Sequence, residues 1–89
     1  MIKENITIIN ELGLHARAAS KFVNTATRFK SEVWLEKDGN KINAKSIMGV
    51  MMLAAGKGTE LELEINGADE KTCFEALRTL INNRFDEGQ

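Results

Sequence analysis

The sequence predicts an α+β domain in which helices cover one face of an antiparallel sheet. Three observations support this prediction. Apolar and polar residues alternate in several segments, helical apolar spacing separates those segments, and a two-residue hairpin signal joins two of them. The resulting order is β-α-β-β-α-β-α, as in split βαβ folds. We expect one domain over residues 1–89, because 89 residues leave no room for a second.

The first strand and the first helix meet at a glycine. Residues 2–9 are rich in β-branched side chains, and Ile6 and Ile8 alternate with polar neighbours, which predicts a strand. Gly13 then interrupts the pattern. From about residue 16 the apolar side chains recur at helical spacing and form one stripe, which consists of Ala19, Phe22, Val23, Ala26 and Phe29.

A hairpin is expected next. Residues 32–37 alternate between apolar and polar side chains, and residues 41–43 provide a short return strand. Asp38-Gly39 between them is the strongest short hairpin signal, because glycine accepts the positive φ that a tight turn requires.

The last strand and the last helix have the clearest patterns. Three glutamates alternate with three apolar residues over residues 60–65, so one face of this strand is buried and the other is wet. Gly67 marks a turn, and Asp69 is expected to cap the final helix. The apolar stripe of that helix consists of Cys73, Leu77, Leu80 and Ile81.

Composition excludes several classes of function. The net charge is −1 and the basic residues are scattered, so the chain lacks the field that drives binding to nucleic acid or anionic membranes. One cysteine cannot form an internal disulfide, and one histidine far from it does not suggest a metal site, so we expect no metal and no cofactor. No apolar run approaches the roughly 20 residues that span a bilayer. We expect a cytoplasmic monomer without a signal peptide.

Residues 13–17, Gly-Leu-His-Ala-Arg, lie where a strand gives way to a helix. The first turn of a helix offers unpaired backbone N–H groups and partial positive charge, which together stabilise an anion. Neutral His15 is a competent nucleophile near pH 7 and can carry a covalent intermediate. Arg17 offers a planar fork of donors suited to a phosphoryl group. The alternative is that His15 is an ordinary surface or capping residue.

Ser46 is expected to cap a short helix over residues 47–53 that is apolar nearly all round. Such a helix needs only one buried stripe, so some of its large apolar side chains should face water and form a contact surface. The alternative is that its methionines fill the core. A phosphate on Ser46 would place about two negative charges beside this surface. The alternative is that Ser46 caps the helix and does nothing more.

Two segments, Gly-Leu-His-Ala-Arg at 13–17 and Lys-Ser-Ile-Met-Gly-Val at 45–50, resemble those of the HPr family. Its members are small histidine phosphocarriers of the bacterial phosphoenolpyruvate-dependent sugar phosphotransferase system. The resemblance covers essentially the whole chain in length, motif separation and element order. It implies an open-faced β-sandwich, with a four-stranded antiparallel sheet and three helices on one side. It also implies a phosphoryl carrier rather than an enzyme.

The resemblance further implies roles for single residues. His15 matches the position that enzyme I, charged from phosphoenolpyruvate, phosphorylates on Nδ1, and the group then passes to enzyme IIA components for sugar uptake and regulation. Arg17 matches the active-site arginine of the family. Ser46 matches the regulatory serine that a dedicated HPr kinase/phosphorylase modifies in many members. The region that docks partners contains Ala16, Ser20, Ile47, Met48 and Met51.

The chain departs from the family pattern at Ala18, where many members have proline. Proline suits the first helical turn without being required there, so we expect altered stiffness and retained phosphorylation. A nitrogen-related paralogue shares the histidine motif, and the intact motif at residues 45–50 favours the sugar branch. Two other classes stay open: a regulatory module that works through Ser46 while His15 is idle, and a small ligand- or RNA-binding domain. Glutamates on the wet sheet face argue against RNA.

Overall fold

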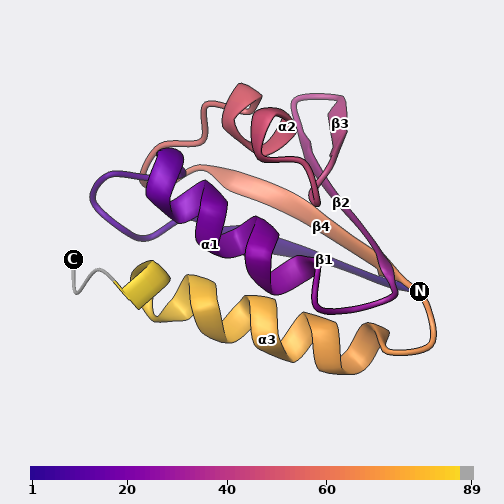
Figure 1. The fold of residues 1–89 in the computed structure, drawn as a ribbon. Helices are drawn as coiled ribbons and strands as arrows, with labels where there is room; N and C mark the ends of the chain where they lie inside the picture. The colour runs from indigo at the N-terminus through magenta and orange to yellow at the C-terminus, as the bar shows by residue number, and fades with distance from the viewer. Residues whose placement is uncertain (87–89) are drawn as a thin grey trace.

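Four antiparallel strands form one sheet in the order β1-β4-β2-β3, and three helices lie on one side of it (Figure 1). The computed structural model describes residues 1–86. The elements are β1 (Ile2–Thr7), α1 (Ala16–Ala26), β2 (Glu32–Lys37), β3 (Asn40–Asn43), α2 (Ile47–Met52), β4 (Glu60–Asn66), α3 (Glu70–Asn82) and the 3₁₀ turn η1 (Arg84–Asp86). The predicted fold class and element order are confirmed. The predicted domain extends to residues 87–89, which lie outside the described residues.

The sheet separates a buried face from a wet one, as the alternation in β4 predicts. Leu61, Leu63 and Ile65 are almost fully buried against the helices. On the opposite face, Lys3 of β1 and Lys41 of β3 approach Glu64 of β4 from either side, with N–O distances of 3.8 and 3.1 Å. Exposed ion pairs of this kind add little stability each. The open face is therefore a solvated, charged surface.

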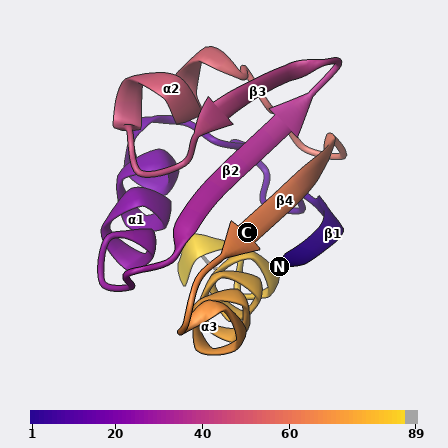
Figure 2. The ribbon, with the colours of Figure 1, turned by 90° about the vertical axis from the view of Figure 1, so that its right-hand side faces the viewer.

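The helical layer is held by one continuous core. Helix α3 packs against β1 and β4, and α1 packs against both α2 and α3 (Figure 2). Phe22 of α1 and Leu77 of α3 are among the fully buried side chains between the helices and the sheet. Cys73 lies in the same core, where burial raises the pKa of its thiol to about 11, so the thiol stays protonated.

The main differences from the sequence prediction are the ends of β1 and α1 and one additional turn. Strand β1 ends at Thr7 rather than at residue 9, and Ile8 instead exchanges backbone hydrogen bonds with Gly58 and Thr59 ahead of β4. Helix α1 ends at Ala26, so Phe29 packs against the core from the following turn. The turn η1 was not predicted at all, because its backbone has positive φ at non-glycine residues.

Asp69 occupies the N-cap position of α3, but its side chain does not cap the helix. Its carboxylate accepts hydrogen bonds from the backbone N–H groups of Lys30 and Ser31, at 2.8 and 2.9 Å, and from the Ser31 hydroxyl. The predicted cap is therefore wrong in its chemistry. Asp69 instead ties the start of α3 to the connection between α1 and β2.

This bridge predicts a loss of stability in acid. The hydrogen bond from the Ser31 hydroxyl, aided by the backbone N–H of Lys30, lowers the pKa of Asp69. A lowered native pKa means that the stabilisation is fully present above the ordinary carboxyl pKa of about 3.9 and is lost as the pH falls through the native value. We expect Asp69→Asn to destabilise the protein at pH 7 and to flatten the fall in unfolding free energy between neutral and acid pH. Urea titrations at several pH values measure both effects. Asp38→Asn, at an exposed turn position, is the matched control, and equal pH profiles for the two variants would contradict the assignment.

Candidate functional site

His15 stands at the junction between the loop after β1 and helix α1, where the sequence analysis places the candidate nucleophile. It is the N-cap of α1, with extended backbone angles (φ −75°, ψ 178°). The backbone N–H of Arg17 donates to Nδ1 of His15 at 3.3 Å. An imidazole nitrogen accepts such a bond through its lone pair. The geometry therefore directs a nucleophilic lone pair towards the amides of the helix N-terminus.

The site has a pocket and cationic groups around this nitrogen. A pocket of about 610 Å³ opens beside His15 and is lined by Glu11, Leu12, His15, Ala16, Arg17, Lys21 and Asp86. The Arg17 side chain is exposed, and its guanidinium forms no ion pair within residues 1–86. A half-buried imidazole, helix amides and an available guanidinium are suited to hold a phosphoryl group that other proteins can still reach.

The loop that carries His15 is held by very close backbone packing. Gly13 has a φ of +67°, and a Cβ atom there would lie 2.6 Å from the carbonyl oxygen of Ala55 and 2.7 Å from Cα of Gly56. The backbone N–H of Leu14 donates to the same Ala55 oxygen at 2.8 Å. From inside the loop, the buried Asn10 side chain donates to the Gly13 carbonyl at 2.8 Å. Only glycine meets both demands at residue 13.

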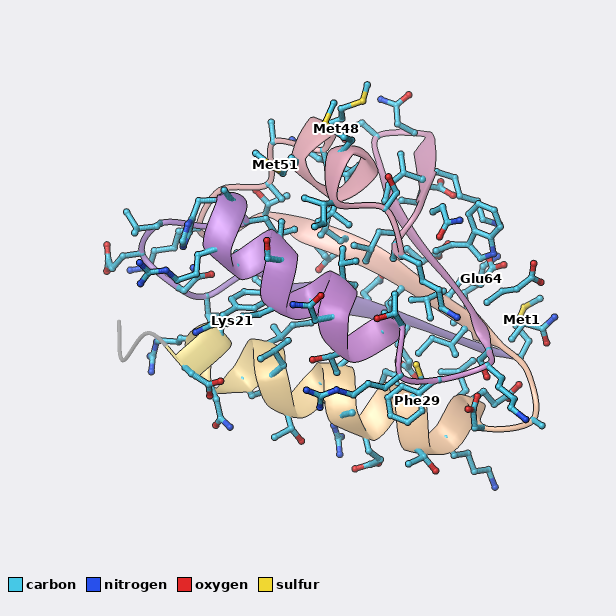
Figure 3. All side chains as sticks on the ribbon, in the orientation of Figure 1. Met1, Lys21, Phe29, Met48, Met51 and Glu64 are labelled. Atoms are coloured by element: carbon cyan, nitrogen blue, oxygen red, sulfur yellow. The ribbon has the colours of Figure 1, made fainter. Side chains whose placement is uncertain are left out.

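Helix α2 presents the predicted contact surface. The Ser46 hydroxyl accepts a hydrogen bond from the Gly49 N–H at 3.2 Å, so the predicted cap is confirmed. Only Val50 of this helix is buried, and Met48 and Met51 project away from the core (Figure 3). The alternative of a methionine-filled core is therefore wrong. We call the following exposed side chains the apolar patch: Ile47 (40% exposed), Met48 (73%), Met51 (42%) and Met52 (77%).

The structure adds residues that sequence reasoning missed. Leu12 is 69% exposed at the rim of the His15 pocket, and Lys21 and Asp86 line the pocket from two different elements. Local patterns do not show which loop residues face a pocket, and Asp86 reaches it only through tertiary packing. Of the predicted residues around His15, Ala16 is exposed and Ser20 half-buried.

Ala18 is fully buried in the first turn of α1. Its backbone N–H lies among the first helical amides, which have no intrahelical acceptor. Proline therefore removes no helical hydrogen bond at this position, which explains how both residue types suit it.

Within residues 1–86, no group of three or more His, Cys, Asp or Glu side chains is placed to hold a metal ion. Among the same residues, no helix is long and apolar enough to cross a membrane.

The close packing at Gly13 predicts a large effect of a single methyl group. Gly13→Ala forces an alanine into the left-handed backbone region and makes its Cβ clash with the Ala55 backbone. We therefore expect a loss of roughly 2–4 kcal/mol in unfolding free energy. Gly39→Ala is the matched control, since it has a φ of +85° and no atom within 4 Å of the added Cβ, and it should lose only about 1 kcal/mol. Denaturant titration measures both values. Equal losses would show that the contact with Ala55 does not constrain the loop.

Comparisons with known proteins identify the family of the chain. The family model for the PTS HPr component phosphorylation site matches residues 2–83. The chain is 60% identical to the phosphocarrier protein HPr of Neisseria meningitidis over all 89 residues of both proteins. The fold is similar to the crystal structure of an HPr from Thermoanaerobacter tengcongensis, with a TM-score of 0.94, 47% identity and 98% of each chain covered. An HPr from Bacillus anthracis gives a TM-score of 0.86 at 39% identity, with 90% of this chain and 95% of that one covered. The chain therefore belongs to the HPr family, the phosphocarrier proteins of the phosphotransferase system.

Proposed function

We propose that this chain accepts a phosphoryl group on Nδ1 of His15 from phosphorylated enzyme I and passes it to enzyme IIA-type proteins. One observation carries the proposal: Nδ1 accepts the Arg17 N–H bond at the N-terminus of α1, so its lone pair is held among anion-stabilising groups. We further propose that the relay runs in the cytoplasm with the chain as a monomer.

The transfer step is a displacement at phosphorus. The Arg17 N–H first releases Nδ1. The freed lone pair then attacks the phosphorus atom of the donor's phosphohistidine, and a new N–P bond forms as the old one breaks. The electron pair of the broken bond returns to the donor imidazole, so no redox partner is needed. The Arg17 guanidinium and the first amides of α1 hold the oxygens of the transferred group while its charge spreads.

The same geometry allows the group to leave again. His15 is only partly buried at the rim of an open pocket, so successive partners can reach its nitrogen. A phosphohistidine held by a few amides and one exposed arginine is stabilised only moderately. The reverse displacement by an acceptor histidine then follows the same path, as a carrier requires.

The apolar patch is the proposed docking surface for these partners. Ile47, Met48 and Met51 are exposed on α2, and Met52 extends the surface they form. Helix α2 packs against α1, whose first turn follows His15. Flexible methionine side chains suit a surface that must accept several different proteins in turn. Ala16 and Ser20 join the same docking region beside His15.

Ser46 is the proposed regulatory site, modified by an HPr kinase/phosphorylase. Its hydroxyl is exposed and caps α2 through the Gly49 N–H, so a phosphate there suits the helix end. The added charge of about −2 would lie at the margin of the apolar patch and oppose docking without unfolding the helix. A purely regulatory module with an idle His15 is the competing function, and phosphorylation of Ser46 alone would favour it.

The carrier function is tested by intact mass spectrometry after incubation with enzyme I and phosphoenolpyruvate. We expect the parent chain to gain one acid-labile phosphoryl group and His15→Ala to gain none. Arg17→Ala should transfer roughly tenfold more slowly, because a charge-assisted contact to the phosphoryl group is lost. Its unfolding free energy should change by only about 0.5 kcal/mol, since the side chain is exposed.

Arg78→Ala removes an exposed arginine on α3 and is the matched control for Arg17→Ala. Normal transfer in Arg17→Ala, or an equal loss in Arg78→Ala, would contradict the role of Arg17. No mass gain in the folded parent, with an active enzyme I, would contradict the carrier function itself.

The role of Ser46 is tested by two substitutions of nearly equal shape. Ser46→Asn and Ser46→Asp can both cap α2, whereas Ser46→Ala should lose about 1 kcal/mol of unfolding free energy with the cap. Ser46→Asp should lower kcat/KM for transfer from enzyme I by about fivefold, since a charge at the rim of a docking surface slows association. Ser46→Asn should transfer normally. Equal rates for the Asn and Asp variants would show that charge at this position does not control docking.

A further inference from the structure

The turn after α3 has an unusual backbone. Arg84, Phe85 and Asp86 have φ values of 53°, 53° and 62°, so three consecutive non-glycine residues are left-handed. L-residues adopt this conformation in succession only where the surrounding structure holds them in it. One such restraint is the Phe85 side chain, which is fully buried in the core.

Lys21 supplies a second restraint from helix α1. Its ammonium group donates a hydrogen bond to the Phe85 carbonyl oxygen at 2.7 Å, across a gap of 64 residues in sequence. The side chain lies between α1 and the chain beyond α3 (Figure 3). Lys21 follows Arg17 by four residues, so the two side chains share one face of α1.

This arrangement places Asp86, the last residue of the turn, in the lining of the His15 pocket. Asp86 and Lys21 both line the pocket that also contains His15 and Arg17. Lys21 is half-buried there, and only one of the three donors of its ammonium group is used by Phe85. The positive charge of Lys21 is therefore present in the pocket in addition to that of Arg17.

The carboxylates of the pocket lining affect how well the pocket holds a phosphoryl group. The group brings about two negative charges to His15. The Glu11 carboxylate in the same pocket is paired with Lys57 at 2.7 Å, and the hydrogen bond from Lys57 lowers the pKa of Glu11. Asp86 is the other carboxylate of the pocket lining, and its position depends on the turn that Lys21 holds.

We propose that Lys21 is a positioning residue for phosphoryl transfer to His15. By binding the Phe85 carbonyl it fixes the turn of residues 84–86 as one wall of the pocket, and its ammonium group adds a second positive charge beside Arg17. The positive charge thereby offsets the repulsion between the phosphoryl group on His15 and the carboxylate of Asp86. This inference rests on the proposed carrier function.

The test uses phosphoramidate as the phosphoryl donor, because a small molecule needs no docking surface. The P–N bond of phosphoramidate breaks, the Nδ1–P bond forms, and the amine leaves as ammonia. We expect Lys21→Met to be phosphorylated about threefold more slowly than the parent. The phosphoryl resonance of Lys21→Met in ³¹P NMR should also titrate at higher pH, since a nearby positive charge that favours the doubly charged phosphoryl form is gone.

Lys21→Arg should restore both the rate and the titration, because it retains a charged donor. Lys71→Met removes an exposed lysine in the first turn of α3, outside the lining of the His15 pocket, and should behave as the parent. If Lys21→Met does not fold, Lys21→Gln keeps a donor for Phe85 and loses the charge, and it should show the shifted titration. An unchanged rate and titration in the folded variant, or equal changes in Lys71→Met, would overturn the inference. A parent chain that phosphoramidate and enzyme I both fail to phosphorylate would instead overturn the carrier function.

Discussion

The contact between Gly13 and the backbone of Ala55 and Gly56 is the constraint on which the site depends. At this point two loops approach so closely that no side chain fits between them, and the Leu14 N–H seals the contact through the Ala55 oxygen. One loop ends at His15 and the other follows α2. His15 and the apolar patch are therefore linked through this contact, although more than 30 residues separate them in the sequence. In the proposed docking mode, a partner on α2 would meet a His15 whose place is already set.

Within residues 1–86, three lysine side chains donate hydrogen bonds to backbone carbonyl groups that follow helices. Lys37 of β2 donates to the carbonyl of Leu53 at the end of α2, at 3.0 Å, and Lys45 donates to the carbonyl of Phe29 beyond α1, at 2.8 Å. Lys21 does the same for the turn after α3. Leu53 is the C-cap of α2, where carbonyl groups lack intrahelical partners and carry partial negative charge, so the Lys37 ammonium group satisfies both needs. Lys45 and Lys21 instead bind carbonyl groups of the connections that follow α1 and α3.

The sequence was sufficient for the elements whose signal is local. Alternation in β4, the helical stripe of α1 and the Asp38-Gly39 turn each depend on neighbouring residues, and the structure has all three. Ser46 was predicted correctly for the same reason, because its cap partner is three residues away. The position of His15 at the start of a helix was likewise predicted from one pentapeptide, and the structure has His15 as the N-cap of α1.

What the sequence could not provide depends on contacts between distant segments. Asp69 is a residue type that commonly caps helices. Its carboxylate instead accepts hydrogen bonds from Lys30 and Ser31, which lie far from it in the sequence. In the sequence, Lys21 looks like an ordinary polar residue of a helix. Only the fold brings the Phe85 carbonyl within hydrogen-bonding distance of its ammonium group. The left-handed turn at residues 84–86 contains no glycine, so no local rule indicates it.

The strand order has a consequence for the way the chain is made. Strand β1 leaves the ribosome first, yet its hydrogen-bonded neighbour in the sheet is β4, with Ile2 opposite Ile65 and Thr7 opposite Glu60. The hydrogen bonds of helix α1 and of the β2–β3 hairpin are local in sequence, whereas those between β1 and β4 are not. Strand β4 then enters between β1 and β2 and pairs with both. Assembly of the sheet is thus an event of late translation, and a nascent chain that stops before residue 60 lacks the strand that joins β1 to the β2–β3 hairpin.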